Sequence, residues 1–235
     1  MNSILYLVAG LLSIASYGQQ TVESTYWRYI NGMEERQVKA GVEQEVYDAN
    51  GLLIEKSHNN GYNKTVYSYN EKKQKVGEED FEGIDKPVIK RSYTYNENGQ
   101  VATMSFPSRN KEGDNFTTTT TYSYDASGRL IKTSTTAEGF REGIIVIYTY
   151  ENKGDKKIVT QRTSTASGKK LKYLNRTTTY NNKDLVVDEI VGSSAYHYEY
   201  IYDAQGEWVT KKVCLKQDRA LSPWRWQGEY RRVKK

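Results

Sequence analysis

The stretch YSYDASGRL, residues 122–130, combines two tyrosines one residue apart with a turn that ends on glycine. Tyr122 and Tyr124 stand at positions i and i+2, which share one face of a β-strand. Asp125 follows, as is typical of the first position of a type I turn, where its side chain accepts hydrogen bonds from the backbone. Gly128 can adopt the left-handed conformation that returns the chain into a strand. The stretch therefore predicts a β-hairpin.

The same pattern recurs along the chain at intervals of 22 to 30 residues, which is typical of a repeat architecture. Its copies are anchored at Tyr47, Tyr69, Tyr95, Tyr124, Tyr150, Tyr180 and Tyr202. The left-handed turn position is glycine in five copies, with Lys73 and Asp184 in the other two. Asp184 tolerates this conformation better than Lys73 does. Lys75 and Lys156 replace an apolar residue in copies two and five, so we expect these two copies to be looser or to lie at exposed positions.

Longer polar segments that contain glycine separate the copies, so the chain alternates strand, tight turn, strand and longer turn. We expect an all-β fold, an antiparallel meander of about seven β-hairpin repeats with about fourteen strands. Twist accumulates in so long a sheet, which should make it a curled or spiral sheet, with closure on itself left open as an alternative. An outer-membrane barrel needs an apolar outward face. Stretches such as TTTTTYSY (117–124) and KKIVTQRTSTA (156–166) place polar residues on both faces, which argues against it.

The first eighteen residues differ from the rest because they carry no charged side chain. An apolar run extends from Ile4 to Ala15, and Ser16 and Gly18 occupy the small-residue positions of a cleavage site before Gln19. This layout predicts a signal peptide over 1–18, with an uncleaved N-terminal anchor as the alternative. We therefore expect an exported protein, located in the periplasm, at the cell surface or outside the cell.

The mature chain, 19–235, has the length of a single domain. We expect the repeats at about 40–213, a C-terminal cap at about 214–235 and no transmembrane span after the signal peptide. Cys214 is the single cysteine, so packing alone must hold the domain together. We interpret Cys214 as a small buried residue rather than as a reactive thiol. The chain contains 21 tyrosines, whose large rings would supply much of the buried surface.

The paired tyrosines with aspartate, glycine and leucine resemble the YD repeat of the Rhs family. Tyr122, Tyr124, Asp125, Gly128, Arg129 and Leu130 carry this resemblance, which extends from about residue 40 to 213. It implies a β-sheet shell, a short exported bacterial member of the family, and carbohydrate binding of the kind attributed to some members. Large members enclose a C-terminal toxin. The sequence is shorter than a full shell needs, and we expect no further domain after the repeats, so a toxin-enclosing role is not part of what we expect from the resemblance.

Residues that could carry catalysis are few. His58 falls in a loop, and His197 shares a strand face with Glu199. A metal site needs several ligands at short spacing, so we interpret His197 as part of a cross-strand polar pair. No catalytic or phosphate-binding motif is present. We therefore expect a protein that is not an enzyme, with no catalytic residue, no metal and no cofactor.

The C-terminal stretch SPWRWQGEYRRVKK (222–235) interleaves aromatic and basic residues. Trp224, Trp226, Tyr230 and Arg225 could stack on sugars and meet an anionic envelope polymer. Alternatively, the two tryptophans cap the open end of the last hairpin, because repeat arrays need atypical ends. The cap is the favoured interpretation. Under the binding interpretation, these four residues are the candidate site. Nucleic acid is an improbable partner for an exported chain.

Three functional hypotheses remain. The first is a non-enzymatic scaffold or binding protein of the cell envelope that engages a glycan through its sheet face. The second is an interaction or accessory module that meets another exported protein through an exposed sheet edge. The third, a distant alternative, is an enzyme whose site the sequence does not disclose.

Overall fold

The computed structural model describes residues 20–30, 33–58, 62–83, 87–109, 113–139, 142–216 and 225–234. The predicted signal peptide lies outside these residues. The one helical element within these residues is a short 3-10 helix, η2 (Lys172–Leu174). No helix in the described part of the chain is long and apolar enough to cross a membrane.

Sixteen strands make up nearly all of the described structure. They are β1 (Gln20–Ile30), β2 (Met33–Tyr47), β3 (Leu53–His58), β4 (Asn63–Tyr69), β5 (Lys75–Glu82), β6 (Pro87–Tyr95), β7 (Val101–Arg109), β8 (Asn115–Tyr124), β9 (Leu130–Ala137), β10 (Ile144–Lys153), β11 (Lys156–Thr165), β12 (Arg176–Tyr180), β13 (Val186–Val191), β14 (Ser194–Tyr202), β15 (Trp208–Lys216) and β16 (Arg225–Lys234).

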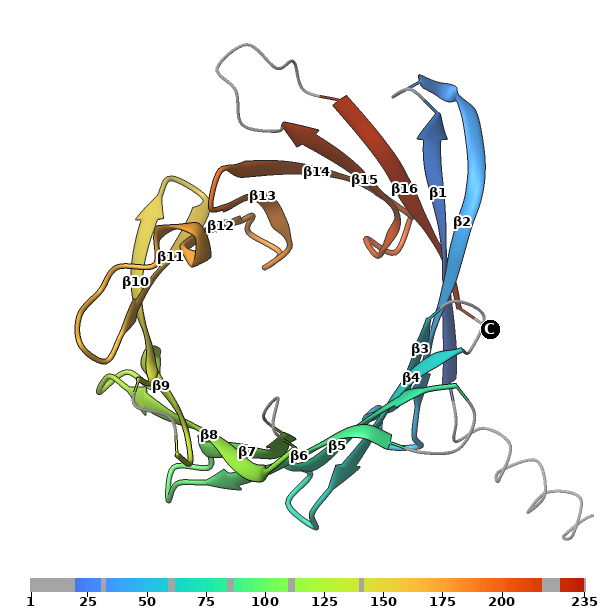
Figure 1. The fold of residues 1–235 in the computed structure, drawn as a ribbon. Coiled ribbons are helices and arrows are strands. Elements are labelled where there is room, and N and C mark those ends of the chain that lie inside the picture. Colours follow the sequence, from blue (N-terminus) through green and yellow to red (C-terminus); the bar gives the residue numbers. More distant parts are fainter. Residues whose placement is uncertain are drawn as a thin grey trace, which may run out of the picture.

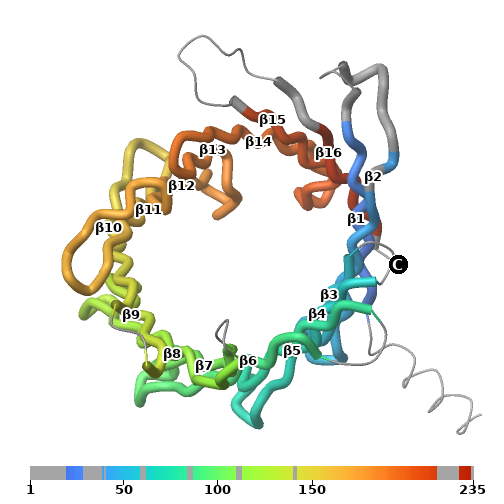
Figure 2. The backbone as a smooth tube through the Cα atoms, in the orientation of Figure 1, coloured from blue at the N-terminus to red at the C-terminus, as the bar shows by residue number. Residues whose placement is uncertain are grey.

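The strands form a closed antiparallel barrel in which each strand pairs with its neighbours in sequence (Figure 1). The expected curled or spiral sheet is therefore wrong. The seven repeats supply the hairpins from β2 to β15, and the two end strands lie outside the repeats. β1 and β16 pair from Val22↔Lys234 to Arg28↔Gly228, which joins the two ends of the meander. Figure 2 shows the resulting closed ring of backbone.

The chemistry predicted for the tight turns is confirmed. The Oδ1 atoms of Asp48, Asn70, Asp125, Asn181 and Asp203 each accept hydrogen bonds from two backbone N–H groups in their turns. Gly128 has a φ of 79°, and Lys73 and Asp184 adopt the same left-handed conformation at 61° and 56°. Copy two, which we expected to be looser, forms the same turn. Copy five forms a different turn. There β10 and β11 pair without a register shift as far as Lys153↔Lys156.

The repeat tyrosines lie on the concave face of the sheet and line the lumen. Arg232 of β16 reaches across β1 to Glu45 of β2, with 3.8 Å between the guanidinium and the carboxylate. Side chains two strands apart converge in this way on the inside of a curved sheet. Strand pairing places Tyr230 and the repeat tyrosines on this same side. The outer wall carries polar pairs such as Glu79 and Lys90, 2.9 Å apart.

The apolar core is thin, because a barrel of sixteen strands is too wide for side chains to fill. Within the described ranges the buried apolar residues are Val22, Val42, Val159 and Cys214, and no side chain is completely enclosed. Cys214 is buried, as the sequence predicted, at 4% exposure. Backbone pairing and the layer of aromatic rings on the inner wall must therefore supply much of the stability.

Candidate binding site in the lumen

Tyrosine hydroxyl groups tie five of the seven repeats to the one before along the inner wall. Each donates a hydrogen bond to the carbonyl of the first strand residue after the preceding tight turn. The pairs are Tyr69 with Leu53 (2.7 Å), Tyr95 with Lys75 (2.8 Å), Tyr124 with Val101 (2.9 Å), Tyr150 with Leu130 (2.7 Å) and Tyr200 with Val186 (2.8 Å). We call this set the tyrosine ladder. Because both ends of each ring are fixed, the ladder gives the lumen an ordered aromatic lining.

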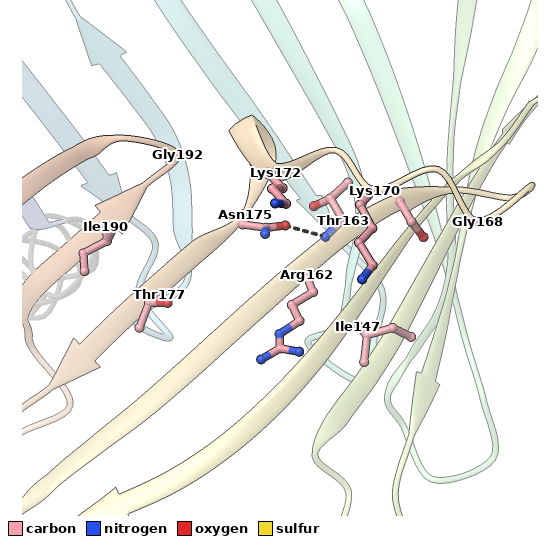
Figure 3. Close-up of a pocket in the computed structure, with 11 residues that line it drawn as sticks. Ile147, Arg162, Thr163, Gly168, Lys170, Lys172, Asn175, Thr177, Ile190 and Gly192 are labelled. Atoms are coloured by element: carbon pink, nitrogen blue, oxygen red, sulfur yellow. Dashed lines mark hydrogen bonds between the residues drawn. The ribbon is translucent and has the colours of Figure 1, made fainter. Parts of the chain in front are cut away.

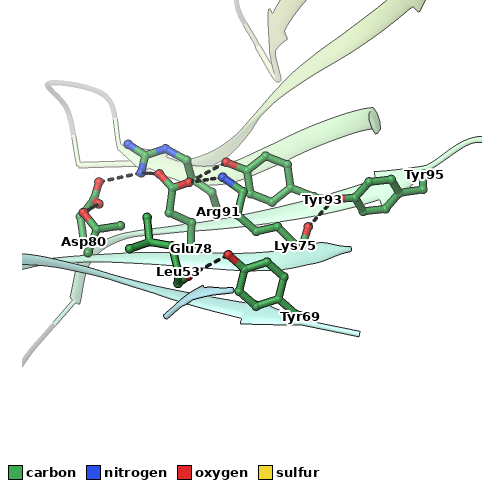
Figure 4. A network of polar contacts seen from close by, with 9 residues as sticks. Leu53, Tyr69, Lys75, Glu78, Asp80, Arg91, Tyr93 and Tyr95 are labelled. Carbon is green, nitrogen blue, oxygen red and sulfur yellow. Dashed lines mark hydrogen bonds and ion pairs between the residues drawn. The ribbon is translucent and has the colours of Figure 1, made fainter. Parts of the chain in front are cut away.

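A charged network sits on the inner wall of β5 and β6 (Figure 4). Glu78 accepts hydrogen bonds from Lys75 (2.6 Å), Arg91 (2.8 Å) and the Tyr93 hydroxyl (2.9 Å), and Arg91 also contacts Asp80 at 2.6 Å. Burial alone would raise the pKa of Glu78, but the hydrogen bonds from Lys75 and Tyr93 outweigh it and hold the pKa below its usual range. The carboxylates of Glu78 and Asp80 are thus matched by donors within the network.

A cavity of about 480 Å³ opens beside the barrel closure, and we call it the seam pocket. Its lining comes from β1, β2, β3, β15 and β16, so it exists only because the two ends of the chain meet. The lining residues are Ser24, Glu43, Glu45, Lys56, Trp208, Lys211, Tyr230 and Arg232. The set combines two carboxylates, three cations and two aromatic rings on the lumen face.

The acids of the seam pocket already have cationic partners. The Lys56 ammonium lies 3.3 Å from Glu45 and 3.7 Å from Glu43. Glu45 also accepts a hydrogen bond from the Tyr47 hydroxyl at 2.9 Å. Both carboxylates are nevertheless only partly buried, at 30% and 26% side-chain exposure for Glu43 and Glu45. Each therefore keeps lone pairs that can accept further hydrogen bonds.

Lys211 differs from the other cations of the pocket, because no described carboxylate forms an ion pair with it. Its ammonium lies over the ring of Tyr230, 4.5 Å from the centroid, and 5.7 Å from that of Tyr198. Burial lowers the pKa of Lys211, and the attraction of Glu43 only partly offsets this. Cation–π contacts satisfy the charge without using the N–H donors. Lys211 thus keeps hydrogen-bond donors for a molecule in the pocket.

The aromatic side of the pocket is closely packed. The rings of Tyr26 and Tyr230 lie 4.7 Å apart at 32°, and Arg232 covers Trp208 at 5.0 Å. Gly228 allows this arrangement, because a Cβ there would lie 2.8 Å from the Tyr26 ring and 2.1 Å from a backbone oxygen. The platform is therefore held in place before any ligand arrives.

Only one of the four predicted binding residues can be placed. Tyr230 lies in the seam pocket. Trp224 lies outside the described residues, and so do the side chains of Arg225 and Trp226, although both belong to β16.

Sequence reasoning missed Lys211 as a partner of Trp208. Strict alternation would put residues three apart on opposite faces of a strand. The register shift between Ile201↔Thr210 and Tyr202↔Trp208 inserts one extra residue, so both side chains face the lumen. The glycine of the preceding tight turn, which signals a bulge, was the available clue.

The histidine interpretation is confirmed. His197 and Asp188 are register partners on β14 and β13, and their side chains meet at 2.7 Å. No cluster of three metal-ligating side chains occurs among the residues that the structure describes.

Comparison with known proteins supports the fold. A porin-like protein from Bacteroides uniformis superposes with a TM-score of 0.55 at 12% sequence identity, covering 92% of this chain and 97% of that one. At such identity the likeness bears on the barrel fold alone. A Photorhabdus luminescens Tc holotoxin pore and a TcdB2–TccC3 complex match with TM-scores of 0.26 and 0.28, at 10% and 11% identity. They cover 81% and 87% of this chain but 16% of each toxin chain, and carry no argument here. No family model and no curated protein matches the sequence.

Proposed function

We propose that this protein is an exported, non-enzymatic barrel of the cell envelope that binds carbohydrate in its lumen, with the seam pocket as the principal site. The observation that carries the proposal is the pairing of an aromatic platform with Lys211, a half-buried cation that has no carboxylate partner among the described residues. The exported location rests on the predicted signal peptide.

The chemistry of the pocket suits a sugar. A pyranose ring presents an apolar C–H face and an edge of hydroxyl groups, and Tyr230 and Trp208 offer aromatic surface next to polar groups. Glu43 and Glu45 can accept hydrogen bonds from hydroxyl groups, and Lys211 can donate to ring or carboxylate oxygens. A few convergent polar groups beside aromatic surface are typical of small-ligand sites.

The outer wall supports a role in an aqueous compartment. Glu79 and Lys90 pair on it, and Thr117, Thr119 and Thr121 face outward on β8 by the register of the strand. A wall that contacts lipid would need a continuous apolar band. A sixteen-stranded barrel leaves water in its interior, so a soluble glycan can enter the lumen.

The test is a binding screen of the mature chain against neutral and acidic oligosaccharides, followed by tryptophan fluorescence. Saturable binding should weaken by about tenfold in Lys211→Met, which removes a charged hydrogen bond but keeps the length of the side chain. Trp208→Phe should weaken binding as well. Tyr62→Ala, which removes a ring that is 59% exposed outside the pocket, is the control and should bind normally. Equal affinity in folded Lys211→Met, or no glycan binding at all, would contradict the proposal.

A second candidate function is supported by the shape of β2. β1 pairs with β2 as far as Met33, whereas β3 pairs with it only from Gln44 to Tyr47. The first part of β2 therefore has a single described neighbour and could accept a strand from another protein. Two separate variants, Val38→Pro and Lys39→Pro, test this, because each removes one backbone N–H group. Neighbouring N–H groups point to opposite sides of a strand, so one variant removes a donor on the side of β1 and the other removes a donor on the opposite side. The variant that stays folded should lose a partner that co-purifies with the native protein, and retention of the partner would argue against strand addition.

A further inference from the structure

A second cavity lies on the outer wall, remote from the lumen lining. This outer pocket has a volume of about 760 Å³ and is bounded by the strands β10 to β13 and by the segment 166–175 that joins β11 to β12 (Figure 3). Arg162, Lys170, Lys172, Ile147 and Ile190 are the lining residues that give it its chemical character.

The pocket is strongly cationic. Its lining contains three basic side chains and no carboxylate. No described acidic residue forms an ion pair with Arg162, Lys170 or Lys172. Figure 3 shows the side chains of Arg162 and Lys170 extending in the same direction on one side of the pocket. Three like charges around one cavity repel one another, and an anion placed between them would relieve that repulsion.

The segment that carries the two lysines is firmly held. The Asn175 side chain accepts a hydrogen bond from the Thr163 N–H at 2.9 Å, and the Leu171 N–H donates to the Thr163 carbonyl at 2.9 Å. The Gly192 N–H donates to the Asn175 carbonyl, also at 2.9 Å. A Cβ at Gly192 would lie 2.8 Å from the Tyr173 carbonyl oxygen, so glycine is needed where η2 packs. The cations are thus presented by a fixed backbone.

Exposed isoleucines flank the charges. Ile147 and Ile190 are 41% and 50% exposed, and both line the pocket. Strand register places them on the outer wall, where β7 to β9 carry mainly threonine and serine. Contact of isoleucine with water is unfavourable, and a hydrocarbon ligand that covered these side chains would remove that cost.

We propose that the outer pocket binds an anionic amphiphile, with a phosphate-type head group between Arg162, Lys170 and Lys172 and a hydrocarbon chain against Ile147 and Ile190. The guanidinium can bind two phosphate oxygens at once, and the lysines add point charges. The site is separate from the seam pocket, so it does not depend on the binding of carbohydrate there.

Calorimetric titration of the mature chain with dodecyl phosphate, kept below its micelle concentration, tests the proposal. Saturable binding is expected, and the triple variant Arg162→Ala, Lys170→Ala, Lys172→Ala should weaken it by at least about tenfold. Inorganic phosphate has the anionic group without the hydrocarbon chain, and dodecyl maltoside has the chain without the charge. Each should bind at least about tenfold more weakly than dodecyl phosphate. Ile147→Thr with Ile190→Thr should weaken the binding of dodecyl phosphate but not that of inorganic phosphate.

The matched control removes three other lysines, Lys72, Lys153 and Lys156, which lie at or beside the tight turns of the opposite barrel end. This variant has the same change in net charge and should bind dodecyl phosphate normally. Equal loss in the control would show that only overall charge matters and would overturn the proposal. Full binding by the site variant, or binding to anionic vesicles without binding to monomeric dodecyl phosphate, would overturn it too. Circular dichroism checks that each variant is folded, and unchanged carbohydrate binding keeps this result separate from that of the lumen.

Discussion

The left-handed residue of the tight turn is the position at which the sequence specifies this fold most strictly. Five copies of the repeat place glycine there, and the same backbone conformation forms at Lys73 and Asp184. A residue with a Cβ adopts this conformation at a cost of about 1–2 kcal/mol. The repeat therefore carries strain in two of its turns, and that strain can be removed by substitution.

Lys73→Gly should raise the free energy of unfolding by about 0.5–1 kcal/mol, because glycine relieves the strain but gives the unfolded chain more conformational freedom. Urea denaturation followed by circular dichroism measures the change. Lys72→Gly, one residue earlier and without positive φ, is the control and should be neutral or destabilising. A destabilised Lys73→Gly variant would show that the turn is not strained.

The aspartates at the start of the turns should make stability sensitive to acid. Backbone hydrogen bonds from Leu52 to Asp48 and from Arg129 to Asp125 lower the pKa of both carboxyls. A lowered folded-state pKa gives stability that is present above the ordinary aspartate pKa of about 3.9 and is lost as the pH falls through the folded value.

Replacing both aspartates by asparagine, which other copies of the repeat use, keeps the acceptor oxygen and removes the titration. Thermal unfolding measured from pH 6 down to pH 2 should therefore show a smaller acid-induced decrease in Tm for Asp48→Asn, Asp125→Asn than for the native chain. Identical pH profiles would mean that these carboxylates do not contribute.

The tyrosine ladder links neighbouring hairpins, so its hydroxyl groups should contribute to stability one repeat at a time. Tyr150→Phe removes only the bond to the Leu130 carbonyl and should lower the free energy of unfolding by about 0.5–1.5 kcal/mol. The destabilisation by Tyr95→Phe should add to that by Tyr150→Phe, because the two bonds lie in different repeats. Tyr173→Phe, at a ring that is 69% exposed, is the control. Equal stability of the control and the ladder variants would argue against the ladder.

The ionisation of two β14 tyrosines should show whether their rings are buried on the inner wall. Burial raises the pKa of Tyr198 and of Tyr200 to about 12, with nearby Glu189 adding to the effect at Tyr198. A tyrosine whose pKa is raised on folding contributes stability that is complete below the ordinary value of about 10 and is lost as the pH rises through the folded value. The free energy of unfolding should therefore decrease as the pH rises from about 10 to about 12.

Ultraviolet titration of tyrosinate in Tyr198→Phe and Tyr200→Phe checks this directly. Each variant should lose part of the late-titrating signal and keep more of its stability at high pH. A single transition near the ordinary tyrosine value in the native chain, with no late component, would contradict the buried placement.

The hairpins follow from the sequence because each depends on a few neighbouring residues. Asp125 and Gly128 define a turn wherever they occur at this spacing, and Tyr124 defines the face of the strand. The seam pocket does not follow in the same way, since Trp208 and Lys211 share a face only through a bulge. The grouping of Lys211 with Glu43 depends further on contacts between the two ends of the chain.

Closure of the sheet is the feature that local patterns could not decide. A meander of hairpins can spiral or close, depending on small twists summed over all its strands. β1 and β16 lack the repeat pattern, and nothing in either stretch alone indicates that it pairs with the other. The thin core adds to the difficulty, because burial of apolar residues does not single out one arrangement. Both the lumen and the seam pocket nevertheless depend on that one pairing.

A disulfide across the seam tests the closure most directly. Glu23 and Val233 are register partners on the outer wall, and directly opposed residues have Cα atoms about 4.5–5.5 Å apart, within the range for a disulfide. In a Cys214→Ala background, Glu23→Cys with Val233→Cys should form an intramolecular disulfide in the folded protein, detected by gel mobility and mass spectrometry. Glu23→Cys with Ile190→Cys, on a distant part of the wall, should not. A folded Glu23→Cys, Val233→Cys protein that stays reduced under oxidising conditions would show an open sheet and contradict the barrel.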